Sequence, residues 1–327
     1  MNIIEVNGLT KKFKDILAVD EVVFSVLKGE IFGFLGPNGA GKTTTINMLC
    51  TLLKPTSGTA TLNGYDIIKE KNRVRDSIGL VFQDPSLDEQ LTARENLEFH
   101  ALIYDVPLKV ARERIKEVVH MVSLADRIND KVETFSGGMK RRLEIARGLL
   151  HHPKVLFLDE PTLGLDPQTR NHIWEYILDL RRKKDITIFL TTHYMDEAEN
   201  CDRIAIIDRG RIIALDTPDN LKKSVGGDVI TLDTADNEKA QKIIESRFGR
   251  QVAIQNGALR FEIEDSDRFI PQLFSKLDME VISINARRPT LDDVFLNLAG
   301  RAIREESADA LGIARAVVRA RRMRGRS

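Results

Sequence analysis

The chain has 327 residues, and its 49 lysine and arginine residues equal its 49 aspartate and glutamate residues in number. This balance excludes the strong positive field that drives non-specific binding to nucleic acid, so we expect no nucleic-acid partner. The longest apolar runs span four or five residues, whereas a membrane-crossing helix needs ~18. Because Cys50 and Cys201 fit neither a disulfide framework nor a zinc motif, we expect a two-domain protein of the reducing cytoplasm.

In the first two thirds of the chain, short apolar runs alternate with stretches of helical spacing. The runs of strand length are Ile31–Leu35, Ile78–Phe82, Val155–Leu158, Ile186–Leu190 and Ile204–Ile207. Strands that alternate with helices predict a parallel α/β sheet. Between the second and third runs, residues 84–150 show helical spacing only, which indicates a helical subdomain inserted into the α/β core.

After Val225-Gly226-Gly227 the pattern changes to strand, helix, strand, strand, helix, strand. The two middle strands flank Asn256-Gly257, a dipeptide typical of tight hairpin turns. This order predicts a small ferredoxin-like α+β domain, followed by a helix over Leu291–Leu298. We therefore expect one domain over residues 1–225, an accessory domain over 226–300 and a separate tail over 301–327.

The tail contains eight arginines, no lysine and three acidic residues. On a helix, its last turns would place several arginines on one face, beside an apolar arc. A solvated tail is the simpler interpretation, and a basic amphipathic helix at anionic lipid headgroups is the alternative. RNA binding is less favoured because no aromatic residues interleave with the arginines.

The strongest motif lies directly after the first apolar run. Residues 36–43 fit the pattern G-x-x-x-x-G-K-[ST], and a helical stretch follows. The glycines let backbone N–H groups turn toward an anion, and the helix N-terminus adds a favourable potential, so this loop predicts a phosphate cradle for a nucleotide. Its residues are Gly36, Pro37, Asn38, Gly39, Ala40, Gly41, Lys42, Thr43 and Thr44. Lys42 would reach the β- and γ-phosphates, and the Thr43 hydroxyl would coordinate Mg²⁺.

Two adjacent carboxylates end the third apolar run. Asp159 follows Val155–Leu158 directly, and Glu160 comes next. A carboxylate at the carboxyl end of a buried strand suits Mg²⁺ beside a nucleotide. Its neighbour can accept a proton from an attacking water, so Glu160 is the expected general base.

Further motifs resemble one family, the ATP-binding subunits of ATP-binding-cassette (ABC) transporters. Phe135-Ser136-Gly137-Gly138-Met139 resembles the family's signature, although Phe135 and Met139 replace its usual leucine and glutamine. The other matches are Gln83 for the Q-loop, Leu165-Asp166 for the D-loop and His193 for the switch histidine. All stand in the family's order. The resemblance implies a P-loop ATPase fold of the ABC type with an inserted helical subdomain.

The resemblance also implies how the site works. Two cassettes would pair head to tail, each ATP lying between one cradle and the partner's Ser136, Gly137 and Gly138. Gln83 and His193 would assist Glu160 in catalysis, and Asp166 would lie at the dimer seam. Phe13 stands where the family stacks adenine, with simple core packing as the alternative. Mg²⁺ would be held by Thr43, Gln83 and Asp159.

Over residues 1–300 the chain resembles the daunorubicin-resistance type of ATP-binding subunit. That type would work with an integral-membrane permease at the inner face of the cell membrane and export a drug or lipid. The alternatives are an importer subunit, whose C-terminal domain is usually a barrel, and a soluble ABC ATPase without a transport role. The second cassette of the dimer could be another copy of this chain or a related subunit.

Overall fold

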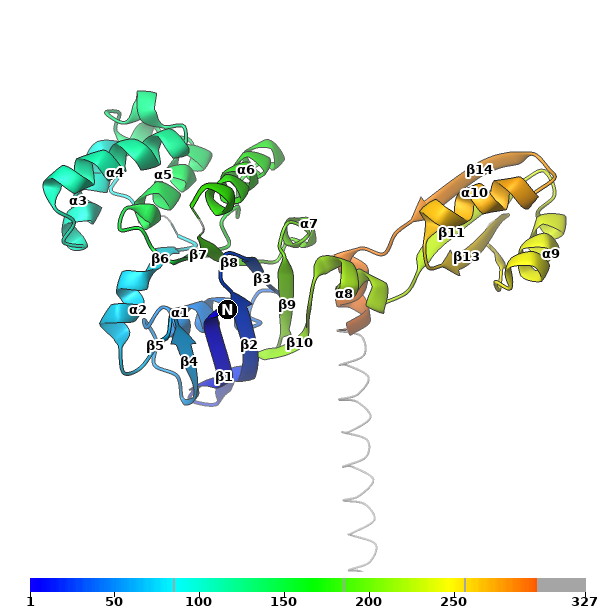
Figure 1. Ribbon diagram of the computed structural model, residues 1–327, viewed down its shortest axis with the longest axis horizontal. Helices are drawn as coiled ribbons and strands as arrows, with labels where there is room; N and C mark the ends of the chain where they lie inside the picture. The colour runs from blue at the N-terminus through cyan, green and yellow to red at the C-terminus, as the bar shows by residue number, and fades with distance from the viewer. Residues whose placement is uncertain (85, 185, 256, 299–327) are drawn as a thin grey trace, which may run out of the picture. The chain divides into compact units, whose positions relative to one another are not determined.

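The computed structural model describes residues 1–84, 86–184, 186–255 and 257–298 (Figure 1). The chain divides into two compact units, Met1–Thr217 and Pro218–Ser327. The division falls before helix α8 (Pro218–Ser224) rather than after it, where the sequence suggested it. The arginine-rich tail, and with it the expected amphipathic helix, lies outside the described residues.

A six-stranded sheet in the order β10-β9-β3-β8-β7-β6 organises the first unit. Its strands are β3 (Ile31–Leu35), β6 (Ile78–Val81), β7 (Val155–Asp159), β8 (Thr187–Thr192), β9 (Arg203–Asp208) and β10 (Arg211–Asp216). All neighbours are parallel except β10, which pairs antiparallel with β9. Every residue of β3, β7 and β8 is buried, as continuous apolar runs require. The predicted parallel α/β core is therefore confirmed, and its strand ends differ by one or two residues.

An antiparallel sheet, β2-β1-β4-β5, packs against this core. Its strands are β1 (Asn2–Phe13), β2 (Ile16–Leu27), β4 (Ser57–Leu62) and β5 (Tyr65–Asp66). The helix α1 (Lys42–Leu49) contributes to the same apolar cluster as both sheets. Phe24 of this sheet lies 5.5 Å from Phe32 and 6.0 Å from Phe189 between ring centroids. This packing holds the start of α1 firmly in place. The sequence analysis did not foresee this sheet.

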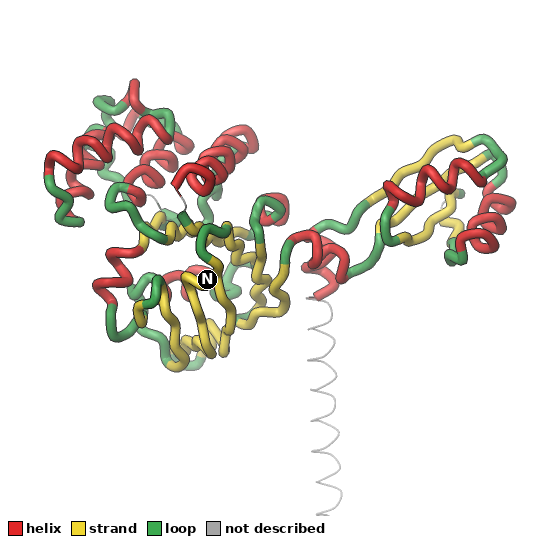
Figure 2. The backbone as a smooth tube through the Cα atoms, viewed as in Figure 1, coloured by secondary structure: helices red, strands yellow, loops and turns green. Residues whose placement is uncertain are grey.

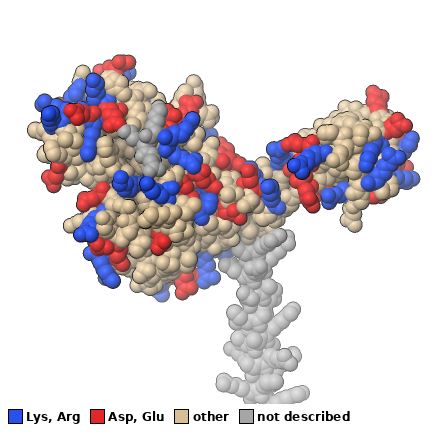
Figure 3. Space-filling model, viewed as in Figure 1, with Lys and Arg blue, Asp and Glu red and all other residues tan. Residues whose placement is uncertain are grey.

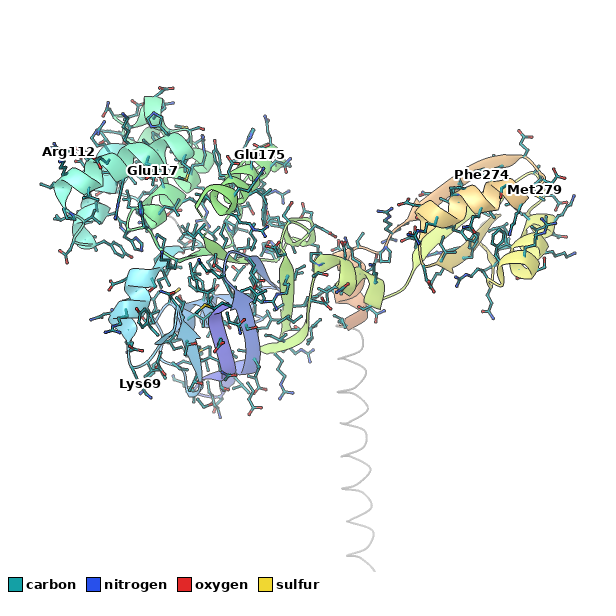
Figure 4. The ribbon with its side chains drawn as sticks, viewed as in Figure 1. Lys69, Arg112, Glu117, Glu175, Phe274 and Met279 are labelled. Carbon is teal, nitrogen blue, oxygen red and sulfur yellow. The ribbon has the colours of Figure 1, made fainter. Side chains whose placement is uncertain are left out.

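Between β6 and β7 the described residues form helices, which confirms the inserted helical subdomain of the fold prediction. They are α3 (Ala93–Ile103), α4 (Leu108–Met121) and α5 (Gly137–Leu149), with short 3₁₀ turns at Ala125–Arg127 and Val132–Thr134. Figure 2 shows these helices gathered on one side of the strands. On α4, Ile115 and Val118 are buried, whereas Arg112 and Glu117 are exposed and point outward in Figure 4. The amphipathic pattern of the sequence is therefore the packing pattern of the helix.

Helices also connect the remaining strands of the first unit. They are α2 (Lys71–Ser77), α6 (Pro167–Lys184) and α7 (Met195–Ala198). Among the described residues, no helix is long and apolar enough to cross a bilayer.

The second unit contains a four-stranded antiparallel sheet, β12-β13-β11-β14. After α8, its elements are β11 (Asp228–Thr234), α9 (Asn237–Phe248), β12 (Ala253–Gln255), β13 (Ala258–Ile263), α10 (Ser266–Lys276) and β14 (Val281–Arg287), followed by a helix over 291–298. A core that includes Ile230, Ile244, Phe261 and Leu273 joins the sheet to α9 and α10. This order and pairing confirm the ferredoxin-like fold. Acidic and basic side chains are intermixed over the visible face of each unit (Figure 3).

Candidate functional site

The glycine-rich loop follows β3 and opens into α1, at the carboxyl edge of the parallel sheet. Its glycines are required by close approaches. A Cβ on Gly36 would lie 2.3 Å from the Ile207 carbonyl oxygen, and one on Gly41 would lie 2.4 Å from the Ala18 carbonyl oxygen. Gly41 also has φ +105°, a conformation that only glycine adopts readily. Since no side chain caps α1, its first N–H groups are available to an anion.

The Lys42 side chain stabilises the glycine-rich loop through hydrogen bonds to its backbone. Its side chain is buried, and Nζ donates to the carbonyl oxygens of Gly36 at 2.8 Å and Pro37 at 3.2 Å. Nζ also forms an ion pair with Glu160 Oε1 at 3.1 Å. A buried ammonium so fixed presents a point charge at a defined place in the cradle.

The two carboxylates at the end of β7 are held by one threonine of β8. Thr191 Oγ1 donates to Asp159 Oδ1 at 2.5 Å and accepts from the Glu160 backbone N–H at 3.0 Å. Glu160 has φ +46°, an uncommon conformation for a non-glycine residue. This turn places its carboxylate between Lys42 and His193, whose Nδ1 lies 3.0 Å from Glu160 Oε2. Strained backbone of this kind is typical of functional sites.

Lys42 and Glu160 line a pocket of about 300 Å³, whereas Asp159 and His193 are not among its lining residues. Gln83, just past the end of β6, and Glu160 line it together with the cradle residues Asn38, Gly39, Gly41, Lys42, Thr43 and Thr44. The structure thus brings together groups that are more than a hundred residues apart in the chain. Phe13 lies at the end of the β1–β2 hairpin, half-exposed, beneath Lys11 Nζ at 5.0 Å, and is not among the lining residues.

The signature residues also lie outside this pocket. Ser136 caps α5, its Oγ accepting from the Met139 N–H at 3.3 Å, and Ser136 and Gly137 are exposed. Gly138 is buried, because a Cβ there would lie 2.4 Å from Thr169 Cγ2 on α6. The N-terminus of α5 therefore lies at the surface of the unit, with Ser136 and Gly137 exposed.

Asp166 lies at the start of α6. Its carboxylate accepts from the Thr169 hydroxyl at 2.6 Å and from the Thr169 backbone N–H at 3.0 Å. These hydrogen bonds, the hydroxyl one first, lower the pKa of Asp166. The residue is exposed and ionised, and it caps the helix as an acidic residue at an N-terminus should.

Three buried charged residues of α5 escaped the sequence analysis. Arg141 donates to the carbonyl oxygens of Phe82 at 2.6 Å, Pro161 at 2.7 Å and Asp159 at 2.9 Å. Three and six residues along, Glu144 Oε1 accepts from the Ser86 N–H at 2.8 Å, and Arg147 Nη2 donates to Ser86 Oγ at 2.6 Å. This face of α5 ties the signature helix to the residues on either side of Gln83. The spacing of Arg141, Glu144 and Arg147 at i, i+3 and i+6 is visible in the sequence, but charged residues at such spacing normally indicate a solvated helix face.

The chain resembles known proteins over both units. A family model described as "ABC transporter" matches residues 19–163, and one described as "ATP-binding protein DrrA1-3-like, C-terminal domain" matches residues 217–299. The linearmycin resistance ATP-binding protein LnrL of Bacillus subtilis is 38% identical over 311 residues, covering 92% of this chain and 100% of LnrL. The daunorubicin/doxorubicin resistance ATP-binding protein DrrA of Streptomyces peucetius is 40% identical over 94% of this chain and 95% of DrrA.

A solved structure with a similar fold is the dimeric post-hydrolysis state of the ATP-binding cassette MJ0796 bound to ADP and Pi. It has a TM-score of 0.59 and 29% identity, and covers 65% of this chain and 98% of that chain. Fold and cradle together make the first unit an ATPase of the ATP-binding-cassette class. Because the similarity continues through the second unit, the chain belongs to the ATP-binding subunits of ABC transporters with a DrrA-like C-terminal domain, and it binds and hydrolyses ATP.

Proposed function

We propose that this subunit drives a separate integral-membrane permease that exports an antibiotic, another drug or a lipid. The printed names of LnrL and DrrA, two resistance proteins that align over nearly the whole chain, support export. The ferredoxin-like second unit supports it too, because importer subunits usually carry a barrel at this position. A soluble ATPase without a transport role is less favoured because LnrL and DrrA are named as resistance proteins. In this proposal the protein is cytoplasmic and is held at the inner membrane face by the permease.

Glu160 is the proposed general base. The observation that supports this role most strongly is the position of its carboxylate, 3.0 Å from His193 Nδ1 and 3.1 Å from Lys42 Nζ at the wall of the cradle. There it would take a proton from the water that attacks the γ-phosphate. His193 would hold that water and contact the γ-phosphate, while Lys42 would bind the β- and γ-phosphates. Gln83, which lines the same pocket, would orient the same water.

Mg²⁺ fits the oxygen donors of the proposed site. The Thr43 hydroxyl, the Asp159 carboxylate and the Gln83 amide oxygen are the hard donors that this ion prefers. Thr191 occupies only one oxygen of Asp159 among the described hydrogen bonds. When bound, the ion would neutralise charge on the β- and γ-phosphates.

The working unit in this proposal is a dimer of cassettes. Ser136, Gly137 and Gly138 lie outside the pocket of their own chain, and the first two are exposed. A second cassette, identical or related, would present these residues to the γ-phosphate, with Asp166 at the seam. The dimeric ADP-bound state of the similar cassette MJ0796 supports this arrangement. Phe13 would stack on adenine, for which an exposed ring at a hairpin end is suitable.

The first prediction concerns Glu160→Gln. Loss of the base should lower ATP turnover by roughly 10²–10⁴-fold, while ATP binding persists because the cradle is unchanged. Turnover is measured by phosphate release and binding by equilibrium dialysis. Glu175→Gln, on the exposed face of α6 (Figure 4), is the matched control and should behave as wild type. Turnover near the wild-type rate in Glu160→Gln would remove this carboxylate from catalysis.

The same variant tests the transport role. Tagged Glu160→Gln protein is captured from detergent-solubilised membranes of its native host in the presence of ATP and Mg²⁺. We expect a polytopic membrane protein in stoichiometric amount. Recovery of a soluble dimer alone would favour an ATPase without a transport role.

A further inference from the structure

The buried carboxylate of Glu197 is not part of the site described above, but it contacts the segments that follow Glu160 and precede His193. Glu197 belongs to the short helix α7 and is 3% exposed. Its Oε1 accepts a hydrogen bond from Thr162 Oγ1, and its Oε2 accepts one from Thr192 Oγ1 at 2.9 Å. Both threonines are themselves 1% exposed. The carboxylate therefore has one hydroxyl donor for each oxygen, and the two donors come from different segments of the chain.

The position of the two threonines explains why this bridge matters. Thr162 follows Glu160 by two residues, in the segment that leads to Asp166. Thr192 ends β8 and immediately precedes His193, and its hydroxyl also accepts from the Tyr194 backbone N–H at 3.0 Å. Glu197 thus joins the segment after the proposed base to the residue before the proposed switch histidine.

Packing alone gives no reason for a carboxylate here. Burying an ionised carboxyl costs free energy unless it is fully hydrogen-bonded. Desolvation raises the pKa of Glu197, and the hydroxyls of Thr162 and Thr192 counter that effect. An apolar side chain would avoid this cost, yet it would leave the two segments without a common partner. The free-energy cost of burying this carboxylate is explained if the activity requires the link between the two segments.

We propose that Glu197 is a positioning residue for ATP hydrolysis. Through Thr162 and Thr192 it sets the distance between the segment 161–166 and His193, and so keeps the His193 ring aligned with the Glu160 carboxylate. The inference rests on the roles proposed above for Glu160 and His193. It predicts that loosening the bridge lowers kcat for ATP while KM and the affinity for ATP change little. The contact between the bridge and the cradle, from the Gly36 N–H to the Thr192 carbonyl oxygen at 3.3 Å, is made by the backbone, not by the hydroxyls that the test removes.

The test uses substitutions that change one hydroxyl at a time. Thr162→Val and Thr192→Val keep the shape of threonine but remove a donor, and each should lower kcat by about 10-fold, as the loss of one hydrogen bond to a charged group implies. Thr162→Ser keeps the donor and should restore most of the wild-type kcat. Glu197→Gln should lower kcat by at least as much as either valine variant.

A matched control lies on the same strand. Thr187, at the opposite end of β8, is fully buried, and its Oγ1 accepts from the Gly29 N–H at 2.9 Å. Thr187→Val should lower Tm by about as much as Thr192→Val and leave kcat and KM at wild-type values. If the bridge only stabilised the fold, the Thr162 and Thr192 variants would match this control, and the inference would be wrong.

The outcome separates this inference from the proposed function. Thr162→Val and Thr162→Ser differ by one hydroxyl, so their comparison remains informative even if Glu197→Gln fails to fold. Full kcat in both valine variants, with Glu160→Gln inactive, would overturn the role of Glu197 alone. Full kcat in Glu160→Gln and His193→Ala would instead overturn the proposed roles of Glu160 and His193, and the positioning role with them.

Discussion

Glu160 and Lys42 depend on each other at the scale of single residues. Both side chains are more than nine-tenths buried, and their charged atoms lie 3.1 Å apart. A buried charge that loses its partner pays a desolvation penalty that the pair does not. The residues proposed to bind phosphate and to activate water are therefore also a structural pair.

This coupling predicts the effect of Lys42→Met. The variant should lose ATP affinity and unfold more easily than wild type by about 1–3 kcal/mol, because Glu160 keeps only His193 as a partner. Adding Glu160→Gln should restore part of that stability, since the uncompensated charge is then gone. Urea unfolding of the single and double variants measures both effects.

The comparison for Lys42→Met is Lys140→Met. Lys140 pairs with Glu89 at the surface, where Glu89 is 55% exposed, and exposed pairs contribute less than about 1 kcal/mol. If Lys42→Met is no less stable than Lys140→Met, the buried pair has no structural role.

At the level of elements, α5 and the residue that follows its C-terminal end contact the segment that leads to Gln83, and α3 packs against them. Arg141 of α5 donates to the Phe82 carbonyl oxygen at 2.6 Å, and His151, just beyond α5, donates from Nε2 to the Ile78 carbonyl oxygen at 2.6 Å. The His151 ring stacks on Tyr104 at 4.0 Å, and Tyr104 lies 4.9 Å from His100 of α3. Since a carbonyl can only accept, Nε2 of His151 carries the proton.

This cluster predicts a pH dependence. Burial, with the Arg147 charge second, lowers the pKa of His100 to about 3, and burial also lowers the pKa of His151. Below pH ~6.5 the two imidazoles bind protons in the unfolded chain, whereas in the folded chain they stay neutral. The free energy of unfolding therefore keeps its full value above pH ~6.5 and falls as the pH drops toward ~3. His100→Gln should reduce that fall by up to about 1.4 kcal/mol per pH unit.

Urea unfolding of wild type and His100→Gln between about pH 7 and about pH 5 measures this difference in slope. The exposed His172, on α6, provides the control variant His172→Gln, which should keep the wild-type slope. Equal slopes for wild type and His100→Gln would mean that His100 is protonated in the folded protein.

In the proposed dimer of cassettes, the cradle of one chain and the signature of the other would form the two halves of one site. Gly137 is exposed, and a Cβ there would meet only Leu165 Cδ2, at 3.4 Å. Gly137→Asp therefore alters the signature surface by a charge without a steric clash. Lys42→Ala alters the cradle side of the proposed site and leaves the signature residues unchanged.

Each of these two variants should be inactive alone, and a mixture of them should regain activity. Random pairing makes half of the dimers mixed, each with one intact composite site, so up to about a quarter of wild-type turnover should return. Phosphate release at varied mixing ratios measures the recovery. A mixture of Lys42→Ala with Glu160→Gln is the control, because both changes lie on the cradle side, and it should stay inactive. Absence of recovery in the first mixture would contradict the shared site.

Patterns among residues that are close in the sequence were enough to predict much of the fold and of the candidate site. The apolar runs of strand length determined the parallel core, and Asn256-Gly257 the hairpin of the second unit, because both depend on neighbours in the chain. The glycine-lysine motif between a strand and a helix predicted the phosphate cradle in the same way. The antiparallel sheet of β1, β2, β4 and β5 was missed, because its strands have irregular register and mixed burial.

Only the tertiary structure decided which charged residues are buried together. Arg141 and Glu197 look like surface residues in the sequence, since their partners are carbonyls and hydroxyls that lie 18 to 59 residues away for Arg141 and as far as 35 for Glu197. Any loop carries such partners, and local spacing does not reveal which of them packing brings within hydrogen-bond distance. The sequence by itself therefore determined the class of chemistry, whereas the packing of the sheets and α5 decided how the reacting groups are held in place.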